Sequence, residues 1–295
     1  MAPSGFYRGW LWRLALALVR LLPLRLFQAV CVAIAELYYR TQRARREVVI
    51  RNFLPVVAND RVAAERKAHA LFRQFAIKLT ELWRFERGMA ADTWFTAGVD
   101  WAILEEACRR GKGVLLLTPH LGNWELGGAL LARRGIKLLV LTQAEPGRGF
   151  TEMRKESRLR WGIETLVIGG NGFDFVEIIK RLQDGANVAL LIDRPPAAKA
   201  VAVQLFGRPF AASIAAAELA RASGCALLGV TVVRAGPGYR AKILPEFRYD
   251  RHALGDRDAR RKLTQQILTA FEPEIREYLD QWYHFVPIWP DNGAD

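Results

Sequence analysis

A histidine and a glutamate five residues apart, His120 and Glu125 in the stretch "HLGNWE", have the residue types of an acid–base pair. A histidine can act as a general base near neutral pH when a second group holds its tautomer and stabilises the imidazolium. We expect Glu125 to be that group, reaching back across a turn. No serine or cysteine stands beside the pair in a G-x-S-x-G arrangement. The nucleophile should therefore be a substrate hydroxyl or amine that attacks an activated acyl group directly.

The same spacing also fits two other interpretations. In the first, His120 is a hydrogen-bonded loop histidine and Glu125 is a first-turn acid favoured by the helix dipole. In the second, His120, Glu125 and Asp193 bind a metal, but that site needs a further histidine or cysteine at a recognisable spacing, and none is visible. We therefore expect no metal and no cofactor. The remaining histidines are interpreted as structural: His69, His252 and His284.

The sequence around the pair predicts a scaffold that would position it. "GKGVLLLTPH" is typical of a turn, a buried strand and a loop, and "NWELGGALLARRG" of a helix with Asn123 as N-cap and Gly135 as stop. From residue 100 onward, helical segments alternate with the apolar runs "VLLLT", "KLLVLT", "TLVI", "VALLI" and "ALLGVTVV". This alternation predicts an α/β fold with a mostly parallel central sheet flanked by helices.

Such sheets bind ligands at the carboxyl ends of their strands, where His120 would lie. Asp193 follows the run "VALLI" and should reach the same edge of the sheet. The alternatives for Asp193 are a helix cap or an ion pair with Arg194. Before the sheet, "RVAAERKAHALFRQFAIKLTELWRF" predicts a long amphipathic helix.

The first 39 residues differ from the rest. Residues 6–39 are mostly apolar, but arginines and a proline interrupt them, so no uncharged run approaches the roughly 18 residues of a membrane span. We expect a helical hairpin or bent helix in the membrane surface, followed by the arginine-rich stretch "RTQRARREVVIR" at the level of anionic head groups. Candidate interfacial anchors are Trp10, Trp12, Tyr38 and Tyr39. We divide the chain into a membrane-associated segment, 1–39, and an α/β domain, 40–295.

The composition indicates which kinds of binding partner and which cellular compartment to expect. Lys and Arg number 43 against 30 Asp and Glu, a formal charge of +13, which favours anionic partners. No ribonucleoprotein motif, zinc spacing or long basic tail is present, so we expect membrane lipids and acidic proteins or cofactors rather than nucleic acid. Three widely spaced cysteines indicate a reducing compartment. We expect a monomer on the cytoplasmic face of the membrane.

The chain resembles the bacterial lipid A biosynthesis (Kdo2-lipid A) acyltransferase family of the lysophospholipid acyltransferase superfamily. The resemblance covers most of the chain and rests on "HLGNWE", "RREVVIRNFLP", "RLRWGIETL", "LQDGANVALLIDRP" and "FGRPFAASIAAAELARASGCALLGVTVVR". It implies that His120 is the catalytic histidine and Glu125 its paired acid. It also implies substrate-binding roles at four positions: Asn123, Arg158, Asp193 and Arg194. Arg158 would meet a phosphate or a developing oxyanion, with Arg154 and Arg160 as alternatives.

The resemblance implies transfer of a fatty acyl chain from acyl carrier protein or acyl-CoA to a hydroxyl or amine of a glycolipid or lysolipid, at the bacterial inner membrane. Two departures leave the acceptor open: "DRP" replaces an aspartate pair, and the chain ends in "QWYHFVPIWP". Relatives of similar build acylate phosphatidylinositol mannosides or other lipids. The alternatives are a catalytically silent lipid-binding protein of the same fold and a metal-dependent hydrolase.

Overall fold

The computed structural model describes residues 9–88, 95, 99–145, 149–169, 173–196, 200–236 and 238–290. The described helices are α1 (Gly9–Leu21), α2 (Leu24–Thr41), α3 (Arg43–Phe53), α4 (Arg61–Glu86), α5 (Trp101–Arg109), α6 (Trp124–Arg133), α7 (Phe150–Leu159), α8 (Asp174–Gln183), α9 (Ala215–Ser223) and α10 (Arg257–Glu277), with the short 3-10 turns η1 (Leu54–Val57), η3 (Ala253–Gly255) and η4 (Leu279–Gln281). The strands are β1 (Val114–Thr118), β2 (Leu138–Gln143), β3 (Ile163–Ile168), β4 (Asn187–Leu191), β5 (Ala200–Leu205), β6 (Arg208–Ser213), β7 (Ala226–Ala235) and β8 (Gly238–Ile243).

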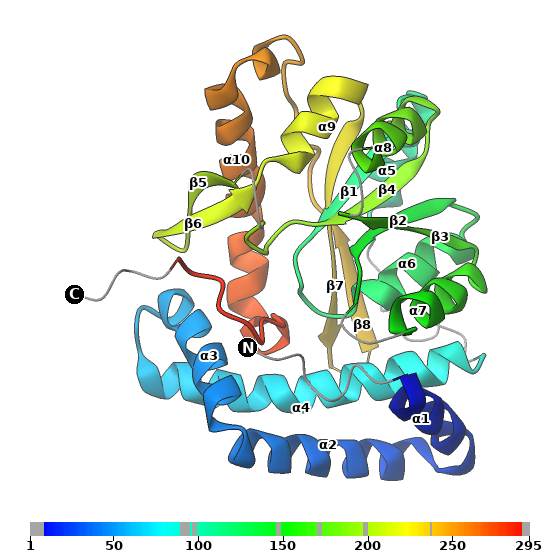
Figure 1. Ribbon diagram of the computed structural model, residues 1–295, viewed down its shortest axis with the longest axis vertical. Coiled ribbons are helices and arrows are strands. Elements are labelled where there is room, and N and C mark those ends of the chain that lie inside the picture. Colours follow the sequence, from blue (N-terminus) through cyan, green and yellow to red (C-terminus); the bar gives the residue numbers. More distant parts are fainter. Residues whose placement is uncertain are drawn as a thin grey trace.

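The centre of the molecule is a six-stranded sheet in the order β3-β2-β4-β1-β7-β8 (Figure 1). The pairs from β3 to β7 are parallel, and β8 returns antiparallel beside β7. Strands β5 and β6 form a separate antiparallel hairpin. Each apolar run singled out in the sequence is one of the sheet strands, so the prediction of a mostly parallel α/β sheet is confirmed.

Helices cover both faces of the sheet, and the side chains of β1 show why its apolar run is continuous. Leu115 and Leu117 pack in a cluster that includes residues of α8, α9 and α10. Val114 and Leu116 point the other way, into a cluster with residues of α5 and α6. A parallel strand buried on both faces needs apolar residues at every position rather than at alternate ones.

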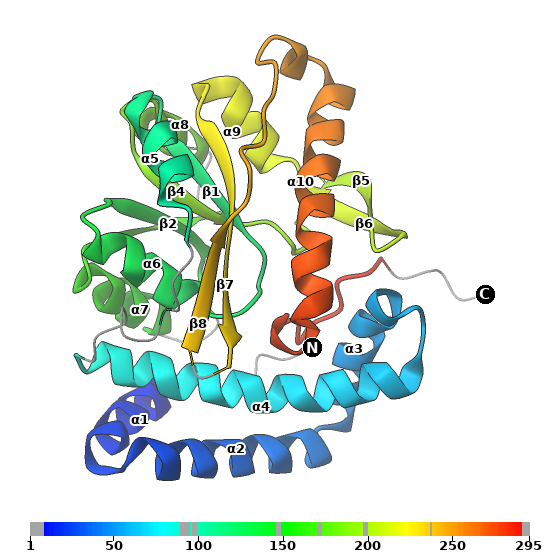
Figure 2. The same ribbon diagram turned by 180° about the vertical axis from the view of Figure 1, so that it is seen from behind.

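The N-terminal helices lie across one end of this sandwich. Helix α4 runs past the end of β7 and β8, and α2 lies along its outer side, as both views show (Figures 1 and 2). Helices α1 and α2 meet at Pro23, so the predicted interruption of the apolar segment is confirmed. None of the described helices combines the length and the apolar composition that crossing a bilayer requires.

Three of the four aromatic residues predicted to be interfacial anchors pack against the protein instead. Trp12 is only 8% exposed, whereas Trp10 is 57% exposed. Tyr38 and Tyr39 are half-buried against Phe72 of α4. Two positions along a helix turn by about 200°, so Trp10 and Trp12 necessarily point to opposite sides. The sequence prediction overlooked this periodicity.

Candidate active site

His120 and Asp193 lie side by side because the strands that precede them are neighbours in register. Strand β1 pairs parallel with β4, with Thr118 opposite Leu191. Each site residue follows its strand by two positions. Both side chains therefore emerge at the same carboxyl edge of the sheet, the usual place for ligands in α/β folds.

The carboxylate of Asp193 is 1% exposed and accepts four hydrogen bonds. Its Oδ1 lies 2.6 Å from Nδ1 of His120. Its Oδ2 accepts from the His120 backbone N–H at 2.8 Å, the Trp282 indole N–H at 2.7 Å and Nε2 of His284 at 2.8 Å. Burial alone would raise the pKa of Asp193, but the interactions with the two histidines hold that pKa well below its usual value.

This network assigns the tautomer of His120. Because an ionised carboxylate only accepts, Nδ1 of His120 carries the proton and Nε2 carries a lone pair. Within the described part of the chain, no group forms a hydrogen bond with Nε2. Burial lowers the pKa of His120 to about 4, against the attraction of Asp193. The imidazole is therefore neutral at pH 7, with its Nε2 ready to accept a proton.

Trp282 and His284 reach the carboxylate from the C-terminal segment that follows η4. This segment pairs with the loop after β1: the N–H of Tyr283 donates to the carbonyl of His120 at 2.8 Å, and Leu121 forms a bridge with Trp282. His284 was predicted to be structural, and the sequence pattern did not indicate Trp282. Two irregular segments far apart in the chain carry no periodic signal that would bring them together.

The structure corrects the predicted role of Glu125. Asp193 bonds to the Nδ1 atom of His120, and Glu125 bonds to arginines of α7 instead. Arg158 forms a two-bond fork on its carboxylate, with Nε at 3.1 Å and Nη2 at 2.6 Å, and Nη2 of Arg154 lies 3.1 Å away. The first turn of α6 faces α7, where these arginines stand one turn apart. Burial would raise the pKa of Glu125, but the arginines hold it well below its usual value.

The arginine predicted to contact substrate is engaged within the protein. Arg158 is 6% exposed, and its fork is used by Glu125. Arg154, the first alternative, is also buried and lies 2.5 Å from Glu86 of α4. Arg160, the second, is exposed. A substrate contact of Arg158 stays a prediction.

The remaining predicted site residues occupy different settings. Asn123 precedes α6 as predicted, but its fully buried side chain donates to the hydroxyl of Tyr239 rather than capping the helix. Gly122 before it has φ +63°, and a Cβ there would lie 2.0 Å from the carbonyl oxygen of Val232, so only glycine fits. Arg194 is exposed, and its charge contributes to the lowered pKa of His120. Among the described ion pairs of Asp193, none involves Arg194.

His120, Asp193 and His284 also have the chemistry of metal ligands, with one candidate atom each within 4.8 Å of the others. Ligand atoms around a tetrahedral zinc with bonds of about 2.1 Å lie roughly 3.4 Å apart. The nitrogen–oxygen distances of 2.6 and 2.8 Å are shorter than that and match charge-assisted hydrogen bonds. The geometry therefore fits a hydrogen-bonded base better than a metal centre.

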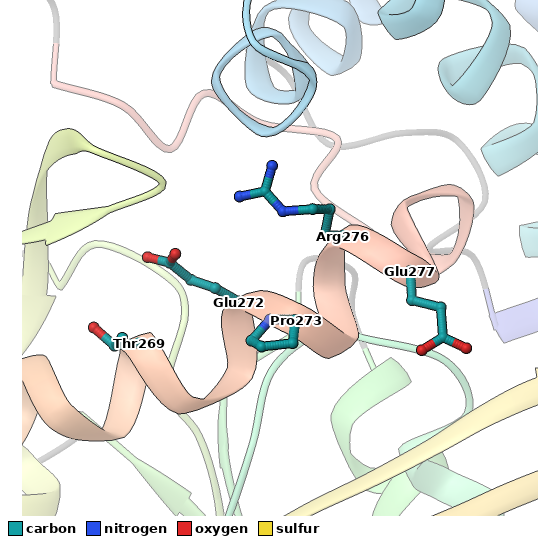
Figure 3. A pocket seen from close by; sticks show the side chains of 5 residues that line it. All are labelled: Thr269, Glu272, Pro273, Arg276 and Glu277. Carbon is teal, nitrogen blue, oxygen red and sulfur yellow. The ribbon is translucent and has the colours of Figure 1, made fainter.

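A depression of about 520 Å³ lies elsewhere, on the C-terminal half of α10. Its lining residues are Thr269, Glu272, Pro273, Arg276 and Glu277 (Figure 3). Glu272 and Arg276 are engaged in the fold, since Glu272 accepts from the N–H of Phe206 and Arg276 donates to the carbonyl of Val56. None of the predicted site residues lines it.

Comparison with known proteins places this geometry in context. The family model described as bacterial lipid A biosynthesis acyltransferase matches residues 2–290. The phosphatidylinositol mannoside acyltransferase of Mycolicibacterium smegmatis is 27% identical over 303 residues, covering 99% of this chain and 92% of that protein. The protein of the same name from Mycobacterium tuberculosis strain H37Rv is 27% identical over 187 residues, covering 63% of this chain and 57% of that protein.

Proposed function

The chain belongs to the bacterial lipid A biosynthesis acyltransferase family and is an acyltransferase, and we propose that it acylates a glycolipid hydroxyl with His120 as general base and Asp193 as its partner. The observation that carries the proposal is the 2.6 Å contact between Nδ1 of His120 and Oδ1 of Asp193 at the carboxyl edge of the sheet. Membership in a family of acyltransferases favours this function over a silent lipid-binding protein.

In the proposed reaction, Nε2 of His120 takes the proton of the acceptor hydroxyl as its oxygen attacks the carbonyl carbon of an acyl thioester. The carbonyl electron pair moves onto oxygen and then returns, which breaks the carbon–sulfur bond. The departing thiolate takes the proton from the imidazolium, so the base is restored. Asp193 keeps Nδ1 protonated throughout and stabilises the imidazolium between the two proton transfers.

We propose a mannosylated phosphoinositide, or a glycolipid of similar head group, as the acceptor. The two relatives carry the name phosphatidylinositol mannoside acyltransferase. The replacement of an aspartate pair by "DRP" and the ending "QWYHFVPIWP" also separate this chain from typical lipid A enzymes. The donor is acyl carrier protein or CoA loaded with a fatty acid.

We propose that α1 and α2 lie in the cytoplasmic surface of the inner membrane. Support comes from a row of exposed apolar side chains at helical spacing on the two helices: Trp10, Leu14, Leu21, Leu26, Val30, Ile34 and Leu37. Arg40, in the last turn of α2, and Arg43, at the start of α3, are exposed and would meet anionic head groups. Arg45 and Arg46 are less available for contact with head groups, because each is partly buried and donates a hydrogen bond to a backbone carbonyl of the protein.

The test is acyl transfer by purified protein in lipid vesicles, with palmitoyl-CoA and palmitoyl-acyl carrier protein as separate donors and a mannosylated phosphoinositide or lipid A precursor as separate acceptors. His120→Ala should abolish transfer while its circular dichroism spectrum stays that of the wild type. Transfer at the wild-type rate by His120→Ala would overturn the mechanism. Activity that survives chelation would set aside the metal-dependent alternative.

A further inference from the structure

Lys78 of α4 is a buried lysine that has no anionic partner in the part of the chain that the structure describes. The residue is 5% exposed. Within the described residues, no oxygen accepts a hydrogen bond from its Nζ and no carboxylate forms an ion pair with it. Its Nζ lies over two aromatic rings instead, 3.0 Å from the centroid of Trp124 and 4.6 Å from that of Tyr283.

The ion pairs recorded beside Lys78 leave it without a carboxylate of its own. Arg154 is paired with Glu86, and Arg158 is paired with Glu125. Two arginines and two glutamates thus balance one another. Burial lowers the pKa of Lys78 well below its usual value, and the attraction of Glu125 opposes this only in part. A buried ammonium without a counter-ion is unfavourable, so the side chain suits a site where negative charge arrives during the reaction.

The position of Lys78 connects it to the base. The ring of Trp124 lies edge-on to that of His120, with centroids 5.4 Å apart, and the backbone of Tyr283 bonds to the His120 carbonyl. The ring of Trp124 and the backbone of Tyr283 therefore join the environment of Nζ to the catalytic histidine. During the reaction, the attacking oxygen, the acyl carbon and the carbonyl oxygen lie between Nε2 of His120 and the donor that meets the oxyanion. These three atoms separate Nε2 from that donor by roughly 7 to 9 Å. Nζ lies 3.0 Å from the centroid of Trp124, which lies 5.4 Å from that of His120, so Nζ is at most about 8.4 Å from the centre of the imidazole.

We propose that Lys78 donates a hydrogen bond to the oxyanion that forms on the acyl carbonyl, an inference that rests on the proposed function. When the acceptor oxygen attacks, the carbonyl electron pair moves onto oxygen, and an N–H of Nζ meets that charge. When the pair returns and the thiolate leaves, the hydrogen bond weakens, and Lys78 keeps its proton. A donor held on an aromatic face in a water-excluded site needs little reorganisation as the charge develops.

Two observations favour an oxyanion over a substrate phosphate as the anion. A lipid phosphate spreads its charge over two or more oxygens and is usually met by several donors, often arginine forks, whereas Nζ is one amine. The fork of Arg158 is already used by Glu125, and Arg154 is paired with Glu86. The one amine of Lys78 therefore suits the single charged oxygen of an oxyanion better than a phosphate group.

The test compares Lys78→Met, which keeps a long unbranched side chain but removes the amine, with Lys67→Met as a control from the same helix. Lys67 lies 3.6 Å from Asp280 in a surface ion pair and has no part in the site. We expect kcat of Lys78→Met to fall about 10²- to 10³-fold, with the KM of donor and acceptor changed by less than about threefold. Lys67→Met should stay within about twofold of the wild type.

Other outcomes would overturn the proposal. Wild-type kcat in folded Lys78→Met, or a change confined to KM, would contradict it. So would competition by inorganic phosphate that Lys78→Met abolishes, because that result assigns Lys78 to a ground-state phosphate. If Lys78→Met does not fold, Lys78→Ala is measured with added ethylamine: recovery of at least about tenfold supports the proposal, and no recovery contradicts it. Loss of transfer in His120→Ala but not in Lys78→Met would refute this inference alone, whereas a wild type without transfer would refute the proposed function.

Discussion

Nδ1 of His120 lies 2.6 Å from Oδ1 of Asp193, although the two residues are 73 positions apart in the chain. The contact fixes which ring nitrogen carries the proton and leaves Nε2 as the base. It also divides the polar residues of the region into two groups. Asp193 bonds to the histidine and is itself held by Trp282 and His284. Glu125 instead pairs with the arginines of α7.

The first prediction concerns pH. Burial lowers the pKa of His120 to about 4, so about nine-tenths of the imidazole should be in its base form at pH 5. We expect kcat/KM at pH 5 to be at least half of its value at pH 7. A histidine with an ordinary pKa would lose about 25-fold over that range. A loss of that size, measured with a stable thioester donor, would contradict the buried-base assignment.

A second prediction concerns the buried ion pair of Glu125 and Arg158. Arg158→Met should lower the free energy of unfolding by about 3 kcal/mol, because it leaves a buried carboxylate short of a partner. The double variant Glu125→Gln with Arg158→Met should recover more than half of that loss. Urea denaturation of the wild type, both single variants and the double variant measures the coupling. Strictly additive effects would show that the pair contributes nothing as a unit.

A third prediction concerns the stability cost of Lys78. Because its pKa is lowered in the folded protein, the unfolded chain binds a proton that the folded chain lacks between the two pKa values. Stability should therefore rise with pH in that window, by about 1.4 kcal/mol per pH unit from this residue. Lys78→Met should remove that slope and match or exceed the wild-type melting temperature at pH 7. If the stability of Lys78→Met rises more steeply with pH than that of the wild type, Lys78 does not lower stability in the way we predict.

The fourth prediction concerns the outer face of α1 and α2. Replacing Leu26, Ile34 and Leu37 by serine should reduce vesicle binding, since it removes exposed apolar area. Replacing Arg40 and Arg43 by alanine should weaken binding to anionic vesicles by about 1 kcal/mol each. The control is Arg261→Ala on α10, where the arginine pairs with Asp258. Sedimentation with neutral and anionic vesicles measures both effects, and equal binding to the two vesicle types would argue against the role of the arginines.

Much of the fold followed from local patterns. The continuous apolar run at 114–118 indicated a strand buried on both faces, and Asn123 and Gly135 correctly bounded the helix that follows His120. The order of the strands was not predictable in this way, because nothing in a strand's own sequence names its neighbour. That order places β4 beside β1 and so gives His120 its partner.

The error over Glu125 has the same origin. Short separation along the chain favoured Glu125 as the partner of His120, but the helix that begins at Trp124 directs its side chain toward α7. Asp193 was placed correctly at the sheet edge, yet only the register of β1 and β4 shows that it meets His120. Lys78 escaped notice because it occupies one position of a long amphipathic helix, where a lysine is usually exposed.

The pairing of His120 with Asp193 is tested by the kcat of Asp193→Asn beside that of Lys67→Met, with palmitoyl thioester and a glycolipid acceptor. The amide keeps the shape of Asp193 but loses its charge and can no longer hold Nδ1 of His120 protonated. We predict a fall of about 10³- to 10⁴-fold for folded Asp193→Asn and less than about twofold for Lys67→Met. If folded Asp193→Asn keeps more than about one-tenth of the wild-type kcat, the pairing of His120 with Asp193 is not the basis of catalysis.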